Sequence, residues 1–181
     1  MRYENEVILK DGRKCCLRNA EETDGQAVYD NYVLTHEQTD YLTCYVDEIP
    51  FTVEQESAFL KAKAESEREV EIMAVVGGTA VGLAGVGSLG DRYKTGHRAV
   101  FGISVDRDYW GLGIGTALMD ACIECARKAG YEQLELEVVG ENETAMAMYR
   151  KAGFVEYGRN PKGFRSRISG YQELVSMRKE L

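Results

Sequence analysis

A glycine-rich stretch follows an apolar run in the middle of the chain. Residues Arg98–Gly115 read RAVFGISVDRDYWGLGIG, in which Gly111, Gly113 and Gly115 alternate with other residues, and a helical pattern starts at Thr116. The first N–H groups of a helix have no backbone partners, and the helix dipole is positive at that end. Glycines also let a ligand approach the backbone closely. The stretch therefore predicts a strand, a loop and a helix start that bind an anion such as phosphate.

The spacing of these glycines excludes two common phosphate loops. The dinucleotide pattern G-x-G-x-x-G would need a third glycine where Thr116 or Leu118 stands, and no Gly-Lys-Ser/Thr follows as in a P-loop. Close packing of a strand against a helix would explain the same glycines. The loop alone thus indicates an anion site without naming its ligand.

A second motif lies further along the chain. Asn142–Tyr149 reads Asn-x-x-Ala-x-x-Met-Tyr and is followed by Gly153-Phe154. With the loop Trp110–Gly115 placed after Val105, this resembles the GNAT superfamily of acyl-CoA-dependent N-acetyltransferases. That family's loop reads Arg/Gln-x-x-Gly-x-Gly/Ala after a strand ending in Val. The resemblance is sharp over Arg98–Phe154, and elsewhere only the order of elements agrees.

The resemblance implies an enzyme that moves the acetyl group of acetyl-CoA, its cosubstrate, to a primary amine by direct attack. Backbone groups of Ile103 and Val105 would pair with the pantetheine arm, wedged between their strand and the strand Gln133–Val139. Asn142 would bond the pantetheine amide or cap its own helix. The pyrophosphate would be held by the loop amides of Leu112, Gly113, Ile114, Gly115 and Thr116.

Two groups acquire catalytic roles from the same resemblance. The backbone N–H of Val105 would polarise the thioester carbonyl. Tyr149, which also belongs to the cofactor site, would donate a proton to the departing CoA thiolate. The alternative for Tyr149 is an ordinary helix tyrosine whose ring packs on the sheet. Arg150 or Lys151 would reach the CoA 3′-phosphate, or would only form part of a solvent-exposed face of the helix.

Two positions depart from the family pattern. Many members carry a glutamate on the strand before the loop, where this chain has Val100. Glu137 on the neighbouring strand, His97 at the strand entrance and Glu37 are the remaining candidates for the base, and water is another. Trp110 replaces the usual Arg or Gln, so we expect it to cover the base of the loop by packing.

The segment Asn31–Glu56 is expected to form the acceptor site, because early helices and loops set acceptor specificity in this family. Aromatic rings interleaved with carboxylates suit a cation, although partly buried aromatics below an acidic edge would give the same pattern. A small amine, a polyamine, an amino acid or a peptide N-terminus all fit. The residues concerned are Tyr32, His36, Glu37, Tyr41, Tyr45, Asp47 and Glu48.

The length of the chain predicts one domain over residues 1–181. The spacing of its hydrophobic residues indicates both helices and strands, and so a mixed α/β class. We expect a central, mostly antiparallel sheet with a parallel pair at the cofactor site and helices on both faces. An Asp11-Gly12 hairpin of type I′ would join the first two strands. The predicted elements are strands Glu6–Leu9 and Lys14–Arg18, helices Asp24–Leu34 and Thr52–Glu65, strands Glu71–Val76, Ala80–Ser88 and Arg98–Val105, helix Gly113–Lys128, strand Gln133–Val139, helix Asn142–Ala152, and strands Val155–Arg159 and Tyr171–Met177 around a loop at Asn160–Gly170.

Composition and net charge indicate which partners and which cellular compartment to expect. The net charge is −8 and the pI is near 4.9, which argues against nucleic-acid or membrane-surface partners. No signal peptide or membrane span is visible, and five cysteines without a disulfide pattern favour the cytoplasm. Cys122 and Cys125 fit one apolar helix face, so no metal is expected.

Phe154–Met177 could pair with a second copy in a homodimer. Alternatives to the enzyme are a silent acyl-CoA-binding or regulatory module, or transfer with another acyl donor or acceptor.

Overall fold

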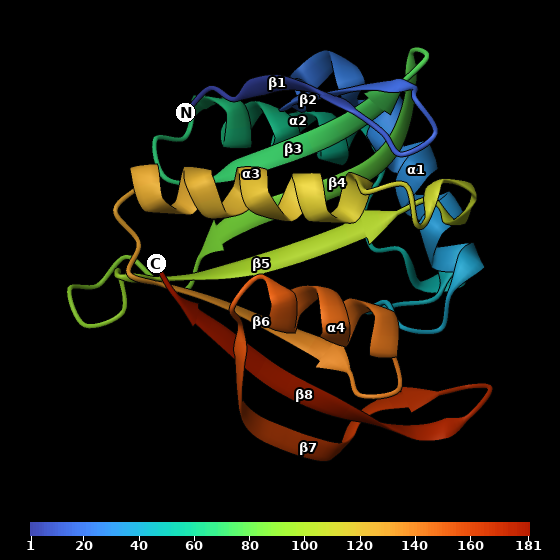
Figure 1. Cartoon of the computed structure of the whole chain (residues 1–181), viewed down its shortest axis with the longest axis vertical. Coiled ribbons are helices and arrows are strands. Elements are labelled where there is room, and N and C mark those ends of the chain that lie inside the picture. The colour runs from blue at the N-terminus through green and yellow to red at the C-terminus, as the bar shows by residue number, and fades with distance from the viewer.

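The computed structural model describes all residues 1–181 and contains one eight-stranded sheet in the order β1-β2-β3-β4-β5-β6-β8-β7 (Figure 1). All neighbouring strands are antiparallel except β5 and β6, which are parallel. This confirms the predicted fold class. The elements are β1 Glu4–Ile8, β2 Lys14–Asn19, α1 Gly25–Gln38, α2 Val53–Glu65, β3 Val70–Val76, β4 Thr79–Ser88, β5 Arg98–Val105, α3 Ile114–Lys128, β6 Gln133–Val139, α4 Glu143–Lys151, β7 Val155–Ser166 and β8 Gly170–Glu180.

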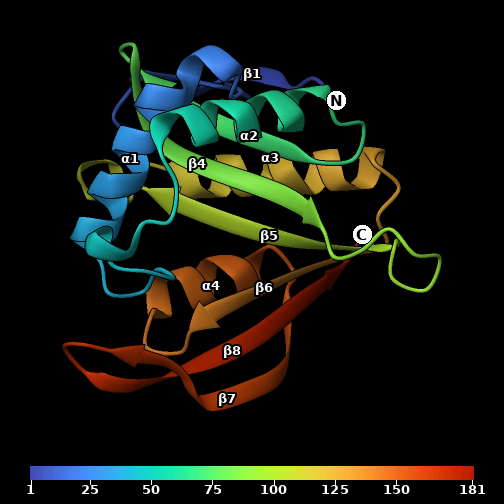
Figure 2. The ribbon, with the colours of Figure 1, turned by 180° about the vertical axis from the view of Figure 1, so that it is seen from behind.

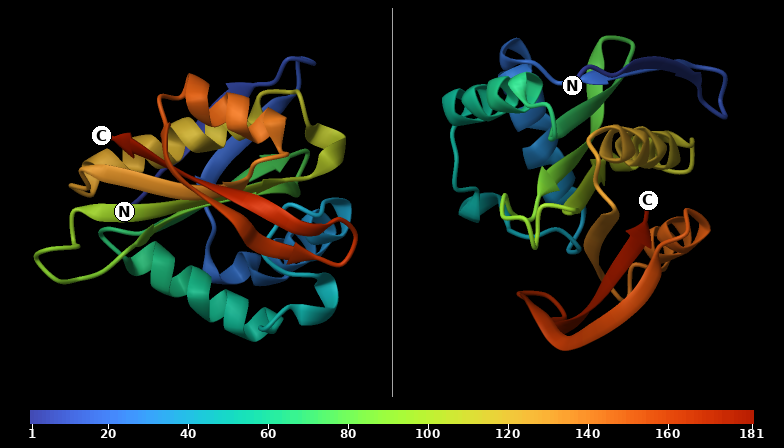
Figure 3. Two further views of the ribbon diagram at one scale, coloured as in Figure 1. Left: turned by 90° about the horizontal axis from the view of Figure 1, so that it is seen from below. Right: turned by 90° about the vertical axis from the view of Figure 1, so that its left-hand side faces the viewer.

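Helices cover both faces of the sheet, as Figure 3 shows. The larger core lies on the face of α3 and α4 and includes Leu118, Leu134 and Met177. A smaller core on the opposite face joins Val28 of α1 and Leu60 of α2 to the sheet. Cys122 and Cys125 are buried free thiols in the larger core, in agreement with the predicted packing role. None of the helices has the length and apolar character needed to cross a membrane.

Local signals in the sequence account for several element ends. Thr52 and Gln55 form a capping box at the start of α2, with Thr52 Oγ1 accepting the Gln55 N–H. The turn at Gly77-Gly78 has positive φ at both residues, as a type I′ turn requires. The type I′ prediction for Asp11-Gly12 is wrong, because Gly12 has φ +88° and Asp11 has negative φ. The glycine alone adopts the left-handed conformation, so the turn is of a different type.

The predicted loop at Asn160–Gly170 is also wrong. β7 and β8 continue through most of it and form one long hairpin that turns after Ser166. The register shifts between Asn160 and Phe164, so this irregularity absorbs Pro161 and its neighbours without ending the strand. At Gly163 a Cβ atom would lie 2.4 Å from Leu174 Cγ, so the bulged backbone sits close against β8.

The parallel pair at the centre of the sheet is very short. β5 and β6 are in register over three residue pairs only, from Arg98 opposite Gln133 to Val100 opposite Glu135. Beyond Val100 the strands separate toward their carboxyl ends (Figure 2), and α4 lies on the α3 face of the sheet beside this opening, as Figure 3 shows. This splay leaves the second half of β5 without a strand partner on that side. It is the feature on which the site is built.

Glu71 of β3 lies partly buried below α2, and its carboxylate has no hydrogen-bond or ion-pair partner. A Cβ atom on Gly85 would lie 2.3 Å from Glu71 Oε2, so the glycine makes room for the carboxylate. Burial raises the pKa of Glu71 to about 7, an effect that Lys63 opposes and Glu56 reinforces. Between the ordinary value of 4.5 and 7, the folded state holds a proton that the unfolded state has lost.

We therefore expect the stability of the wild-type protein to fall, relative to Glu71→Gln, as the pH rises from 5 to 8. At pH 8 the variant should be more stable by roughly 1–3 kcal/mol, and this advantage should shrink toward pH 5. Urea denaturation at each pH measures the difference. Glu67→Gln, at an exposed position, is the control and should show no such trend. A pH-independent difference for Glu71→Gln would contradict the assignment.

Candidate active site

The free edge of β5 points its backbone groups into the splay. The Asp106 N–H donates to the Val81 carbonyl at 2.9 Å, so Asp106 is oriented toward β4. In an antiparallel pair alternate residues direct N–H and C=O to opposite sides. Ile103 and Val105 therefore direct theirs away from β4, toward β6, where pairing has already ended. These are the two residues for which the sequence predicted backbone contacts to a ligand.

Trp110 is involved in this edge in a way that the sequence did not indicate. Its indole Nε1–H donates to the Val105 carbonyl at 2.7 Å, and the side chain is 52% exposed. The predicted packing role is thus replaced by a hydrogen bond that ties the loop to the end of β5. One backbone group of Val105 is used in this way, while its N–H still faces the splay.

The glycine loop leads directly into an uncapped helix. Gly113 is the N-cap of α3 with φ +100°, a conformation that favours glycine, and no side chain caps the helix. The first turn contains no acidic residue. The Leu112 carbonyl accepts the Lys10 N–H at 3.2 Å, which anchors the loop to the β1–β2 turn. The amides from Ile114 to Thr116 are left for a ligand, as at other anion-binding helix starts.

α4 packs against this helix start. A Cβ atom on Gly115 would lie 3.2 Å from Met148 Sδ, so the glycine allows close approach of the two helices. Asn142 is the N-cap of α4, and its Oδ1 accepts the Ala145 N–H at 3.2 Å. The capping use predicted for Asn142 is therefore present, and its side-chain amide N–H groups have no partner within the chain.

Tyr149 lies on the α3–α4 face of the sheet beside β5. It is 7% exposed, and its ring packs edge-on against Phe101 at 6.3 Å and Phe154 at 5.9 Å between centroids. Its hydroxyl makes no hydrogen bond within the chain. Burial raises the pKa of Tyr149 well above its ordinary value, so the phenol keeps its proton at neutral pH.

Glu137 lies on the opposite face of the sheet. Its carboxylate is exposed and accepts a hydrogen bond from Ser176 Oγ at 3.2 Å. Extending the β5–β6 register by two residues places Gly102 opposite Glu137 across the splay. A Cβ atom on Gly102 would meet nothing within 4 Å, so this face of β5 is open at Gly102. Tyr149 and Glu137 thus flank the splay from its two faces.

The structure does not bring His97 to this site. His97 precedes the first residue of β5, eight residues from Val105, which corresponds to about 25 Å along an extended strand. It lies where β5 and β6 are still paired, at the end away from the loop. Glu37, the third candidate base, lines a different cavity at the end of α1.

That cavity is formed by the predicted acceptor segment. Its volume is about 350 Å³, and its lining includes His36, Glu37, Asp40 and Ile168. It adjoins the splay, because Gln38 Nε2 donates to Asp106 Oδ1 at 2.8 Å and Gln38 Oε1 accepts the Arg107 N–H at 2.8 Å. The acceptor segment and the carboxyl end of β5 are therefore held together.

Part of the predicted cation site is occupied by the chain itself. Arg167, at the tip of the β7–β8 hairpin, bonds Asp47 at 2.7 Å and Glu48 at 2.9 Å, and lies 4.3 Å from the ring centre of Tyr45. The sequence did not single out Arg167, since nothing local indicates a contact across some 120 residues. These three groups fix the hairpin to the segment.

The remaining aromatics of the segment form a compact cluster. Tyr32 stacks on His36 with 3.8 Å between ring centres, and Phe51 packs edge-on against Tyr32 at 5.1 Å. Burial lowers the pKa of His36. The alternative of partly buried aromatics therefore describes Tyr32, His36 and the half-buried Tyr41, while Glu37 is exposed.

Comparison with known proteins agrees with this architecture. The model of the "Acetyltransferase (GNAT) family" matches residues 28–154. The chain is 32% identical over 149 residues to an N-alpha-acetyltransferase of Sulfurisphaera tokodaii, covering 81% of this chain and 84% of that protein. It is 36% identical to the N-alpha-acetyltransferase RimI of Mycobacterium tuberculosis, over 58% of this chain and 61% of that one.

Other relatives are matched over a smaller part of their length. A mycothiol acetyltransferase of Propionibacterium freudenreichii is 46% identical over 30% of this chain, and the match spans only 18% of that protein. Among solved structures, a GNAT-family acetyltransferase from Streptococcus pneumoniae superposes with a TM-score of 0.88 at 26% identity, covering 92% of this chain and 99% of that one. With the splay and the glycine loop in place, these matches establish that the chain belongs to the GNAT family of acetyltransferases.

Proposed function

We propose that this protein is an N-acetyltransferase that moves the acetyl group of acetyl-CoA to a primary amine. The observation that carries the proposal is the splay of β5 and β6 directly before the uncapped start of α3. An extended, amide-containing chain can pair with the free edge of β5, and its pyrophosphate can bind the helix start. Two GNAT structures that share the fold, from Salmonella typhimurium and Sinorhizobium meliloti, were determined with acetyl-CoA.

Each part of the site has a task in binding this cosubstrate. The amides of the loop from Leu112 to Thr116 would hold the pyrophosphate, and Gly113 keeps the space in front of them open. Ile103 and Val105 would pair with the pantetheine arm. Asn142 can donate its free amide N–H to the same arm while its oxygen caps α4. When bound, the cosubstrate supplies an acetyl thioester, an electrophile for the amine.

The proton transfers require a base on one face and an acid on the other. Glu137 lies on the face of α1 and α2, where the amine would enter, and would take the ammonium proton directly or through water. The Val105 N–H would stabilise negative charge on the thioester oxygen. Tyr149 would donate its hydroxyl proton to the sulfur. Burial raises the pKa of a thiol as it does that of a phenol, which keeps this transfer feasible.

The acceptor is proposed to be a primary amine on a small molecule or at a peptide N-terminus, bound in the cavity of the acceptor segment. Glu37 and Asp40 provide negative charge in that cavity. Similarity to proteins named N-alpha-acetyltransferase and [Ribosomal protein bS18]-alanine N-acetyltransferase supports a peptide acceptor. We also propose a cytoplasmic location, with which five free cysteines agree, and a homodimer formed through the exposed edge strand β7.

Release of CoA thiol from acetyl-CoA, measured against a panel of small amines, polyamines and peptides with free N-termini, tests the activity. An absence of acceptor-dependent release across the panel would favour the silent-module alternative. The Glu137→Gln variant tests the base, and its kcat/KM is expected to fall about 100-fold near neutral pH.

The pH profile separates catalysis from structure in this variant. A glutamine cannot accept the ammonium proton, so activity should recover partly at high pH, where more of the amine is already neutral. Glu4→Gln, an exposed strand glutamate far from the splay, is the control and should retain full activity. Full activity of Glu137→Gln at neutral pH would remove Glu137 as the base and leave water.

A further inference from the structure

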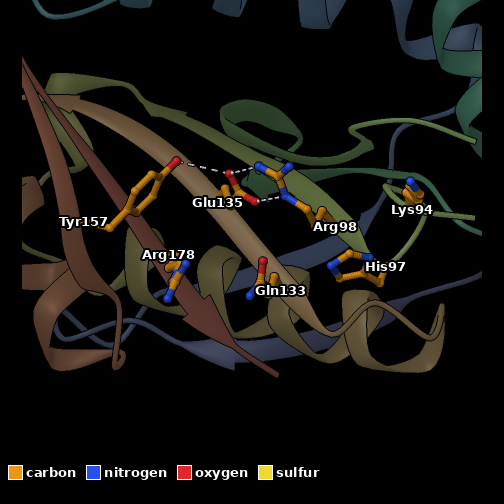
Figure 4. Close-up of a pocket in the computed structure, with 7 residues that line it drawn as sticks. All are labelled: Lys94, His97, Arg98, Gln133, Glu135, Tyr157 and Arg178. Atoms are coloured by element: carbon orange, nitrogen blue, oxygen red, sulfur yellow. Dashed lines mark hydrogen bonds and ion pairs between the residues drawn. The ribbon is translucent and has the colours of Figure 1, made fainter. Parts of the chain in front are cut away.

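A second cavity lies at the paired end of β5 and β6, away from the glycine loop. Its volume is about 330 Å³, a size typical of small-molecule sites. Residues from the loop before β5, from β5, β6, β7 and β8 line it. In Figure 4, Tyr157 and Arg178 lie at one end of the group, Lys94 and His97 at the other, and the Arg98–Glu135 pair between them.

The only carboxylate in the lining is already neutralised. Arg98 donates to Glu135 through Nε at 2.5 Å and through a terminal nitrogen at 2.8 Å, and the Tyr157 hydroxyl donates to it at 3.1 Å. Glu135 is 8% exposed, and the Arg98 guanidinium holds the pKa of its carboxyl below the ordinary range. Glu135 therefore forms a fixed floor of the cavity. Its negative charge is already paired with Arg98 and does not neutralise the other cations of the lining.

Three cationic or hydrogen-bonding groups around this floor remain available. Lys94 Nζ and the His97 ring have no hydrogen-bond partner within the chain. Arg178 has one long ion pair, with 3.6 Å from its Nε to Glu180 Oε1, and that oxygen also accepts a hydrogen bond from the Gln133 side chain at 3.0 Å. The lining of this cavity carries more positive than negative charge, whereas the chain as a whole has a net charge of −8. The cavity would therefore attract anions that the rest of the surface repels.

We infer that this cavity binds the phosphate group of a small anionic molecule. The guanidinium of Arg178 offers paired N–H donors to oxyanion oxygens, and Lys94 offers a point charge from the other side. His97, which lies too far from the splay to serve the proposed catalysis, adds a ring N–H beside Lys94. The cavity is larger than phosphate itself, so the rest of the ligand would lie over the Arg98–Glu135 floor and against Tyr157.

Titration with inorganic phosphate and pyrophosphate, followed by NMR, tests the site. The chain has two histidines, so the ring signals of His97 are assigned readily, and the Nε–Hε signal of Arg178 reports from the other end. Chloride is exchanged for the anion at constant ionic strength and pH. Backbone amides of Gly113–Thr116 report separately on any binding of the same anion at the start of α3.

Saturable shifts of His97 and Arg178 are expected, with pyrophosphate binding more tightly than phosphate. The double variant Lys94→Ala with Arg178→Ala should weaken the affinity about tenfold. Arg127→Ala with Lys162→Ala removes the same net charge elsewhere and should leave it unchanged. Linear shifts without saturation, unchanged affinity in the first double variant, or equal losses in both would overturn the site.

Discussion

The Gly113→Val variant is expected to bind acetyl-CoA at least about 100-fold more weakly than the wild-type protein. Gly113 has φ +100°, where a β-branched residue is strained by roughly 1–3 kcal/mol. Relief of that strain would turn the loop amides away from their present direction. A Cβ atom at Gly113 meets nothing within 4 Å, so the added side chain would project into the open space before the helix. Isothermal titration calorimetry with acetyl-CoA measures the loss.

A matched glycine at the far end of the same helix separates strain from binding. Gly130 follows α3, has φ +78° and also has open space around its Cβ position. Gly130→Val should therefore lower the melting temperature in a similar way and leave the affinity for acetyl-CoA unchanged. Normal affinity in Gly113→Val, in a folded protein, would show that the helix start does not hold the pyrophosphate.

The Tyr149→Phe variant should lower kcat about 100-fold while the KM for acetyl-CoA changes little. General acids contribute factors of about this size, and phenylalanine removes only the hydroxyl proton. The ring contacts with Phe101 and Phe154 remain, and the hydroxyl has no partner to lose, so stability should be preserved. Steady-state kinetics with a good amine acceptor, together with thermal melting, measures both quantities.

Tyr131 supplies the control for this variant. It is 3% exposed, and its hydroxyl is buried without a hydrogen-bond partner, but it lies between α3 and β6 away from the splay. Tyr131→Phe should keep full activity. If Tyr149→Phe were equally active, the tyrosine would be a packing residue and the thiolate would take its proton from solvent.

The sequence predicted the elements around the site because their signals are local. The apolar run before the glycines, the cap at Asn142 and the glycine after α3 each act within a few residues, and β5 and β6 have the predicted bounds. The two errors differ in origin. Asp11-Gly12 does form the turn between β1 and β2, but the strands pair only as far as Ile8 and Lys14, so the turn is longer than two residues. Pro161-Lys162-Gly163 is a turn signal by composition, but the pairing of β7 with β8 decided its conformation.

What the sequence could not provide was contact between distant segments. Arg167 on Asp47 and the Trp110 indole on the Val105 carbonyl depend on the assembled fold. The same is true of Glu137 and His97. Both are plausible bases by residue type, but only the register of β5 and β6 places Glu137 beside the open gap and His97 at the closed end.

The three residue pairs that join β5 to β6 also affect how cooperatively the protein folds. They divide the sheet into a five-stranded block, β1 to β5, and a three-stranded block, β6, β8 and β7, each with a continuous hydrogen-bond ladder of its own. Partial opening can therefore follow this seam, since few hydrogen bonds cross it. A ligand that pairs with β5 inside the gap adds hydrogen bonds across the seam and stabilises both blocks together. The cosubstrate would thus act as a removable strand. The coupling between the two blocks of the sheet would rise when it binds and fall when CoA leaves, once in each catalytic cycle.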